Sequence, residues 1–206
     1  MFPMPPTLSW RQQPALRLLA LLLLCVVPLA AQETPVSHFN AGVRKFWQGD
    51  LPGAIAEFDR AIELNPEYWK AFSSRGVAKQ NKGDLQGALR DQSRSIEINP
   101  KNAGAYSNRG TVYRDLKNLE AALADYSTAL SLDPADWYTY SNRGVVQFDK
   151  GLLAAAIADF SKAIELKPDY AEAWFNRGVA RRRNGDEAGG NADKAHAAEL
   201  DPRFRK

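Results

Sequence analysis

The chain has 206 residues, of which 45% are hydrophobic and 25% are charged. This balance is typical of a globular domain or a short repeat array, and it excludes a wholly disordered chain. Two of the 27 basic residues lie in the first 31 positions, so the remainder is close to neutral against 24 acidic residues. A nearly neutral chain gives no indication of nucleic-acid binding.

The segment 1–31 differs in composition from the rest of the chain. It contains Arg11 and Arg17, no acidic residue, a short apolar run over 18–27 and small residues up to Ala31. These features are typical of a secretory signal peptide, and the run is shorter than the roughly 20 residues of a membrane-spanning helix. We therefore expect cleavage after residue 31, a short linker over 32–34, and an exported chain that is periplasmic or secreted if the source is bacterial. An uncleaved segment would instead anchor the chain to a membrane.

A 34-residue period governs the remaining sequence. Five prolines recur at this interval: Pro66, Pro100, Pro134, Pro168 and Pro202. When each unit ends two residues after its proline, five units result, followed by a tail at 205–206: 35–68, 69–102, 103–136, 137–170 and 171–204. Positions within a unit are called places 1 to 34 below. Place 8 is always glycine, and place 20 is alanine in four units and glycine in the fifth. A fixed period of this length indicates a repeat array.

Each unit predicts two helices in succession. A glycine such as Gly49 or Gly83 at place 15 can end the first helix in the left-handed conformation. An aspartate or asparagine such as Asp84 or Asn118 can then cap the second helix, and the residue before each proline resists helical geometry and closes it. Two short helices cannot bury an apolar face alone, so the units are expected to stack.

This pattern resembles the tetratricopeptide repeat family, whose unit is a pair of antiparallel helices. The resemblance covers residues 35–204 and implies an all-α fold, a right-handed α-solenoid of five helix-turn-helix repeats. The fifth unit carries Asn191 and Ala198 where earlier units carry isoleucine or leucine, and Lys194 where three of the four earlier units carry an aromatic residue. Because a terminal repeat needs a polar outer face, the array is expected to end there.

Charged residues of opposite sign recur at two places of the unit. Place 7 holds arginine in four units: Arg75, Arg109, Arg143 and Arg177. Place 23 is acidic in all five: Glu57, Asp91, Asp125, Asp159 and Asp193. Both places neighbour the close-packed places 8 and 20, so we predict structural ion pairs across the helix interface; the alternative is a row of ligand-binding arginines. The sequence leaves open whether each arginine meets the acid of its own repeat or of the preceding one.

Place 6 is the candidate binding position. It reads Asn40, Ser74, Asn108, Asn142 and Asn176. It points about 200° away from place 8 on the first helix, and the resemblance implies that first helices line the concave surface. Amide groups both donate and accept hydrogen bonds, so such a row can pair with the backbone of an extended peptide. The row resembles asparagine ladders with which members of the family grip extended segments; the alternative is a solvated polar face.

Other residues on the same stripe vary between repeats. Tyr138 and Glu172 hold place 2 of their units, and Phe148 and Arg182 hold place 12. Variation is expected if side-chain specificity is added to a repeated backbone grip. The carboxylate clamp of chaperone-binding family members requires cations that are missing from the corresponding places around Asn108, so we do not predict it.

Signals for catalysis are weak. The sequence has two histidines, His38 and His196, and no phosphate-binding loop, nucleophile elbow or paired-histidine metal motif. We expect no enzymatic activity, cofactor, metal site or nucleic-acid partner. The predicted function is an exported protein–protein interaction module that binds an extended peptide or protein segment in the concave groove through the asparagine ladder. The alternative is a structural adaptor in an envelope complex that uses its end or convex surfaces.

Overall fold

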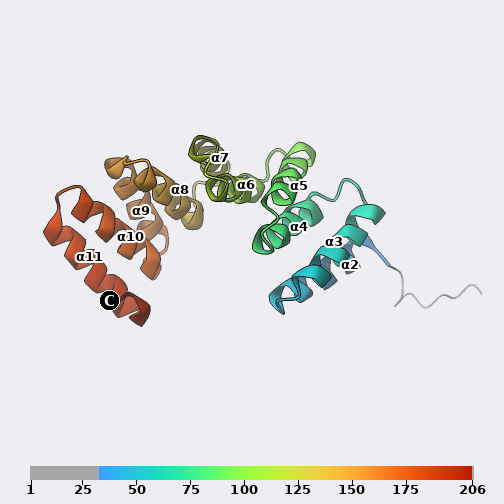
Figure 1. The fold of residues 1–206 in the computed structure, drawn as a ribbon, viewed down its shortest axis with the longest axis horizontal. Helices are drawn as coiled ribbons and strands as arrows, with labels where there is room; N and C mark the ends of the chain where they lie inside the picture. Colours follow the sequence, from blue (N-terminus) through green and yellow to red (C-terminus); the bar gives the residue numbers. More distant parts are fainter. Residues whose placement is uncertain (1–32, 206) are drawn as a thin grey trace, which may run out of the picture. The chain divides into compact units, whose positions relative to one another are not determined.

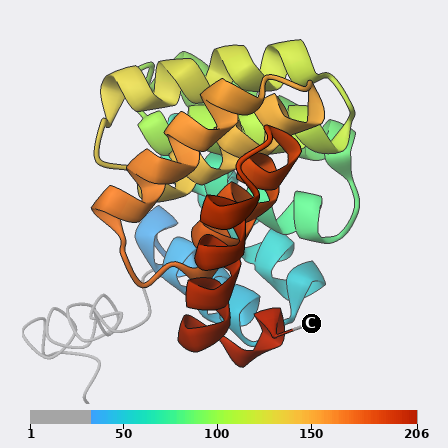
Figure 2. The same cartoon turned by 90° about the vertical axis from the view of Figure 1, so that its left-hand side faces the viewer.

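The computed structural model describes residues 33–205, and these residues form α-helices joined by short turns (Figure 1). The first helices of the five repeats are α2 (Pro35–Trp47), α4 (Trp69–Asn81), α6 (Ala103–Asp115), α8 (Trp137–Asp149) and α10 (Ala171–Arg183). The second helices are α3 (Leu51–Leu64), α5 (Leu85–Ile98), α7 (Leu119–Leu132), α9 (Leu153–Leu166) and α11 (Glu187–Leu200). A short 3-10 helix, η3 (Pro202–Phe204), follows α11 at the C-terminal end (Figure 2).

The predicted signal peptide and its cysteine, Cys25, lie outside the described residues. Within residues 33–205, none of the helices combines the length and the apolar character that crossing a bilayer requires.

The turn inside each repeat has the predicted chemistry. Glycines at place 15 have φ between 77° and 93° in four repeats, and Lys117 takes the left-handed conformation with φ 63° in the third. The next residue caps the second helix in four repeats, where its side chain accepts a hydrogen bond from a backbone N–H three residues on: Asp50, Asp84, Asn118 and Asp186. The fourth repeat has Leu152 at this position and no side-chain cap.

The helices pack in two ways. Each helix contacts the helices before and after it, and first helices also contact the first helices of neighbouring repeats. In the part of the chain that the structure describes, no two second helices contact each other as extensively. The first helices therefore form a continuous layer, and the fold is the predicted all-α solenoid of helix-turn-helix pairs.

The core between paired helices is made by places 8, 20 and 24. Ala122 and Ala156 at place 20 are fully buried, as are the side chains of Tyr126 and Phe160 at place 24. A Cβ atom added to Gly110 at place 8 would lie 2.9 Å from the Tyr126 ring. In the fifth repeat places 8 and 20 are both glycine, Gly178 and Gly190. A Cβ atom at Gly178 would lie 2.7 Å from the backbone oxygen of Gly190. The space beside place 8 is thus filled by the place-24 side chain in four repeats and by the backbone of place 20 in the fifth.

The close approach gives a test within α6. Gly110→Ala should lower the free energy of unfolding by roughly 1–3 kcal/mol, because the new methyl group has to displace the Tyr126 ring. Gly104→Ala is the matched control, since its Cβ would meet only the Asn102 side chain, at 3.5 Å. The control should raise stability by about 0.5–1 kcal/mol because alanine is the better helix former. Urea unfolding followed by circular dichroism measures both; equal effects would contradict the packing argument.

Candidate protein-interaction surface

The place-7 arginines bind the acid of their own repeat. Arg143 donates from Nε and Nη2 to the two carboxylate oxygens of Asp159, at 2.7 and 2.8 Å. The same two-bond geometry, with distances of 2.6–2.8 Å, recurs in the other three pairs: Arg75–Asp91, Arg109–Asp125 and Arg177–Asp193. All four acids are buried. Each place-7 arginine therefore pairs with the place-23 acid of its own repeat and not with that of the preceding one.

The third nitrogen of each arginine reaches the preceding repeat. Nη1 of Arg109, Arg143 and Arg177 donates to a serine at place 25 of the repeat before, at 3.1–3.3 Å. Arg75 meets Asp59 there at 2.5 Å. Each guanidinium group thus links its own helix to two others and uses three of its five N–H donors in doing so. The hydrogen bond to Asp159 raises the pKa of Arg143 against the opposing effect of burial, so the group stays charged.

The first repeat has a different arrangement because place 7 is Ala41. Its acid, Glu57, lies 2.7 Å from Lys45 Nζ and 2.7 Å from His38 Nδ1. Hydrogen bonds from Lys45 and then from His38 lower the pKa of Glu57. A cation from the first helix, Lys45, therefore pairs with place 23 even where the arginine is missing.

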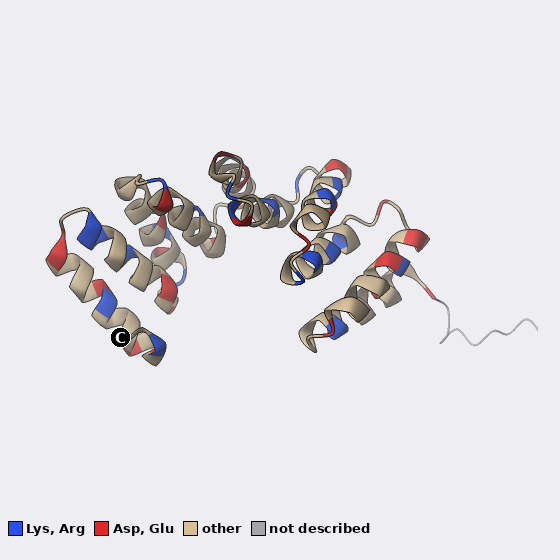
Figure 3. Cartoon of the chain, in the orientation of Figure 1, with Lys and Arg blue, Asp and Glu red and all other residues tan. Residues whose placement is uncertain are grey.

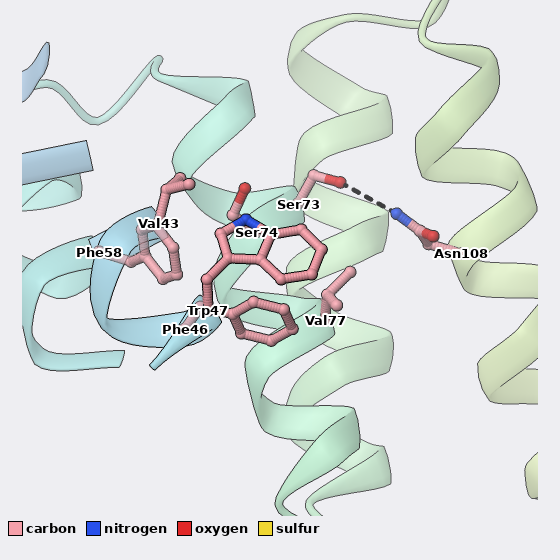
Figure 4. A pocket seen from close by; sticks show the side chains of 8 residues that line it. All are labelled: Val43, Phe46, Trp47, Phe58, Ser73, Ser74, Val77 and Asn108. Carbon is pink, nitrogen blue, oxygen red and sulfur yellow. Dashed lines mark hydrogen bonds between the residues drawn. The ribbon is translucent and has the colours of Figure 1, made fainter. Parts of the chain in front are cut away.

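The asparagine row differs from one repeat to the next. Asn40 is exposed, and Ser74, Asn108 and Asn176 are partly exposed on their first helices. Asn108 Nδ2 lies 3.5 Å from Ser73 Oγ, which is a long hydrogen bond (Figure 4). Asn108 is therefore close to the neighbouring repeat and still accessible to a ligand.

Asn142 departs from the expectation of an exposed ladder. Only 8% of its surface is accessible, and its Oδ1 accepts a hydrogen bond from Arg114 Nη1 at 3.3 Å. Its Nδ2 atom is buried without a hydrogen-bond partner among the residues that the structure describes. The reason is the long side chain at place 12 of the preceding repeat, which reaches place 6 of the next.

The other predicted contact residues are spread along the first helices. Tyr138 is 49% exposed, and Phe148 packs against the cluster of Ala156, Phe160 and Ala180. Glu172 is exposed and accepts a hydrogen bond from Tyr170 at 2.6 Å; burial and this bond raise the pKa of Tyr170. Arg182 pairs with Glu187 at 2.9 Å. Arg182 is thus already engaged at the surface.

A cavity between the first and second repeats contains residues that sequence reasoning did not select (Figure 4). This N-terminal cavity has a volume of about 210 Å³. It is lined by Val43, Phe46, Trp47, Phe58, Ser73, Ser74, Val77 and Asn108. Trp47 is 80% exposed and holds place 13, where the other repeats have asparagine, aspartate or arginine. A tryptophan at a place that is polar in the other repeats was the sequence signal that could have identified this cavity.

Two further cavities follow along the same layer. The middle cavity, of about 330 Å³, is lined by Val77, Gln80, Asn81, Asn108, Thr111, Asp115 and Tyr138. The C-terminal cavity, of about 70 Å³, is lined by Val145, Phe148, Phe160, Asn176 and Val179. Asn108 belongs to both the N-terminal and the middle cavity.

Charged side chains do not gather on one helix. Figure 3 shows acidic and basic residues interspersed along the described helices. The described residues contain no group of His, Cys, Asp and Glu side chains placed to hold a metal ion. Paired helices stacked through buried ion pairs, with cavities along the first helices, define a helical-repeat scaffold.

The family comparison specifies the class. The family described as "TPR repeat" matches residues 44–83, 110–151 and 146–185, and the one described as "Tetratricopeptide repeat" matches 93–124. These matches cover more than half of the chain, which therefore belongs to the tetratricopeptide repeat family. The family consists of scaffolds that mediate protein–protein interactions.

Solved structures share the fold at low sequence identity. MamA from Desulfovibrio magneticus RS-1 is 20% identical with a TM-score of 0.72, over 84% of this chain and 97% of that one. YrrB, described as a TPR protein with an unusual peptide-binding site, is 22% identical with a TM-score of 0.64, over 80% and 85%. PilF from Pseudomonas aeruginosa is 17% identical with a TM-score of 0.73, over 82% of each chain. A comparison with curated proteins gives no match.

The geometry of the arginine–acid pairs generates a stability test. Arg143→Leu should lower the free energy of unfolding by roughly 2–4 kcal/mol, because the Asp159 carboxylate would remain buried without its partner. The double variant Arg143→Leu/Asp159→Asn should lose less of the free energy of unfolding, since the unpaired buried charge is then removed as well. Arg94→Leu, which removes an exposed pair with Glu67 and Glu97, is the control and should change the melting temperature little. An unchanged melting temperature for Arg143→Leu would contradict a structural role.

Proposed function

We propose that the chain binds an extended peptide or protein segment along its layer of first helices. Place-6 side chains would pair with the segment's backbone, and neighbouring side chains would select its residues. The observation that supports this most directly is the position of Asn108, whose amide is partly exposed and lines two cavities at once. A segment crossing from one cavity to the other would pass this amide.

The chemistry of the row suits backbone recognition. An asparagine amide offers two N–H donors and a carbonyl acceptor, the same groups that an extended backbone presents. The bond from Asn108 to Ser73 is long at 3.5 Å, so a peptide carbonyl could replace it at little cost. Asn40 and Asn176 extend the row toward the two ends of the array, while Ser74 supplies only a hydroxyl group. Arg114 covers Asn142, so backbone contacts are expected mainly at the other places.

The site gives a binding test with the double variant Asn108→Ala/Asn176→Ala. The probe is a fluorescein-labelled 12-residue peptide, selected from a displayed random library on the immobilised chain and measured by fluorescence anisotropy. Each lost hydrogen bond contributes about 0.5–1.5 kcal/mol, so affinity should fall by about 5- to 150-fold. The melting temperature of the double variant should not fall, because alanine is a better helix former than asparagine.

The control for this test is Asn191→Ala, at an exposed asparagine on the second helix of the last repeat. It makes the same chemical change away from the first helices and should leave affinity unchanged. Affinity of the double variant within twofold of the parent chain would contradict the proposal. That result would favour the adaptor alternative, in which the end or convex surfaces make the contacts.

We also propose that the chain acts outside the cytoplasm. The support is the sequence of residues 1–31, with its two arginines, apolar run and terminal small residues. The mature protein should begin near Gln32, and the intact mass of the native protein, purified from separated cell fractions, measures this. A soluble cytosolic protein that retains the first 31 residues would contradict export.

A further inference from the structure

The N-terminal and C-terminal cavities occupy the same position in the repeat. The first is formed by places 9, 12 and 24 of repeat 1 and places 6 and 9 of repeat 2: Val43, Phe46, Phe58, Ser74 and Val77. The second is formed by the same places of repeats 4 and 5: Val145, Phe148, Phe160, Asn176 and Val179. Places 9, 12 and 24 are valine and phenylalanine in both. Two equivalent apolar cavities therefore lie three repeats apart on one layer of helices.

The two junctions between them carry a polar side chain at place 12, and the first of them also carries one at place 24. Between repeats 2 and 3, place 12 is Gln80, which donates to Asp115 at 2.7 Å, and place 24 is Gln92, which is buried and bonds to Ser73. Between repeats 3 and 4, place 12 is Arg114, which bonds to Asn142. An apolar side chain placed at either junction would leave these groups without full hydration and without new partners, which is unfavourable.

We infer that the segment bound on the proposed surface carries two bulky apolar side chains, one for each end cavity, with polar residues between them. This inference rests on the proposed function and specifies the class of partner. Adjacent packed helices lie about 8–10 Å apart, so three repeats span on the order of 30 Å. An extended chain covers about 3.3–3.6 Å per residue, which places the two apolar side chains roughly eight residues apart.

Charge favours a basic residue between the two. Place 13 is acidic in repeats 3 and 4, with Asp115 lining the middle cavity and Asp149 exposed on α8. Arg114 offsets part of this charge through its 3.4 Å contact with Asp115. At the ends of the array, place 13 is instead Trp47 at the N-terminal cavity and Arg183, whose guanidinium lies 5.1 Å from the Phe148 ring. Of the place-13 residues, Asp115 is thus the acidic one that lines the middle cavity.

The test uses a designed set of fluorescein-labelled 16-residue peptides and the chain without its first 31 residues. Two leucines are placed two to twelve residues apart in a serine- and glycine-rich sequence with a central lysine or glutamate. Anisotropy should show the tightest binding near a separation of eight, with lysine preferred over glutamate. Peptides with one leucine should bind roughly 10- to 100-fold more weakly.

Variants of the chain assign each leucine to a cavity. Val43→Phe and Val145→Phe fill the same place of the two end cavities, and neither residue lines the middle cavity. Each variant should reduce the two-leucine peptide to the affinity of a one-leucine peptide. Ala158→Phe, on the exposed face of α9, adds the same group elsewhere and should have no effect. Trp47→Ala removes a wall of the N-terminal cavity from a side chain that is 80% exposed, so it should weaken binding without lowering the melting temperature.

The outcomes separate this inference from the proposed function. If peptides bind regardless of leucine spacing and of the filling variants, while Asn108→Ala/Asn176→Ala still weakens them, the two anchors are wrong and the backbone grip stands. If none of these designed peptides binds while the library-selected peptide still does, the two anchors are wrong and the proposed function stands; if neither kind of peptide binds, both are wrong. If the chain self-associates in sedimentation and Trp47→Ala restores the monomer, a second copy occupies the N-terminal cavity, and the inference is overturned.

Discussion

The bidentate hydrogen bond between the place-7 arginine and the place-23 acid sets the orientation of the first helix, and the interaction surface depends on that orientation. It crosses the interface of the paired helices, as in Arg143–Asp159, and so fixes how far the first helix is rotated about its own axis. The third nitrogen then ties that helix to the repeat before. Because a Cβ atom at Gly144 would lie 2.8 Å from the Phe160 ring, close packing at place 8 restricts the same rotation. Charge pairing and close packing act together.

Once the rotation is fixed, the neighbouring place 6 can only turn away from the paired helix and toward the surface of the first helices. The surface is therefore a consequence of the packing behind it. Its chemistry is set by the side chains at places 9, 12, 13 and 24, of which places 12, 13 and 24 differ most between the five repeats. Phenylalanine at place 12 leaves an apolar cavity, as at Phe46 and Phe148, whereas Arg114 at the same place reaches across and binds Asn142.

Sequence reasoning was accurate wherever a residue type repeats and its role is local. The helix pairs, the left-handed turns and the caps follow from glycine, aspartate and asparagine at fixed places, because each acts on its own backbone. It was less accurate for Asn142, whose helical position predicted exposure. Periodicity gives the direction of a side chain, but it does not show which neighbour covers it. Trp47 was missed because it holds a place at which tryptophan does not recur, and sequence reasoning selected mainly residues that recur from repeat to repeat.

The sequence by itself determined the repeat length, the class of fold and the place at which a contact row could form, because these depend on spacing along one chain. Only the tertiary structure decided which acid each arginine meets, since the acids of its own repeat and of the preceding one lie about equally far away along the chain. It also decided that cavities form between repeats 1 and 2 and between repeats 4 and 5. A cavity depends on the side chains of several helices at once, and on whether a long polar side chain from the next helix fills the space between them.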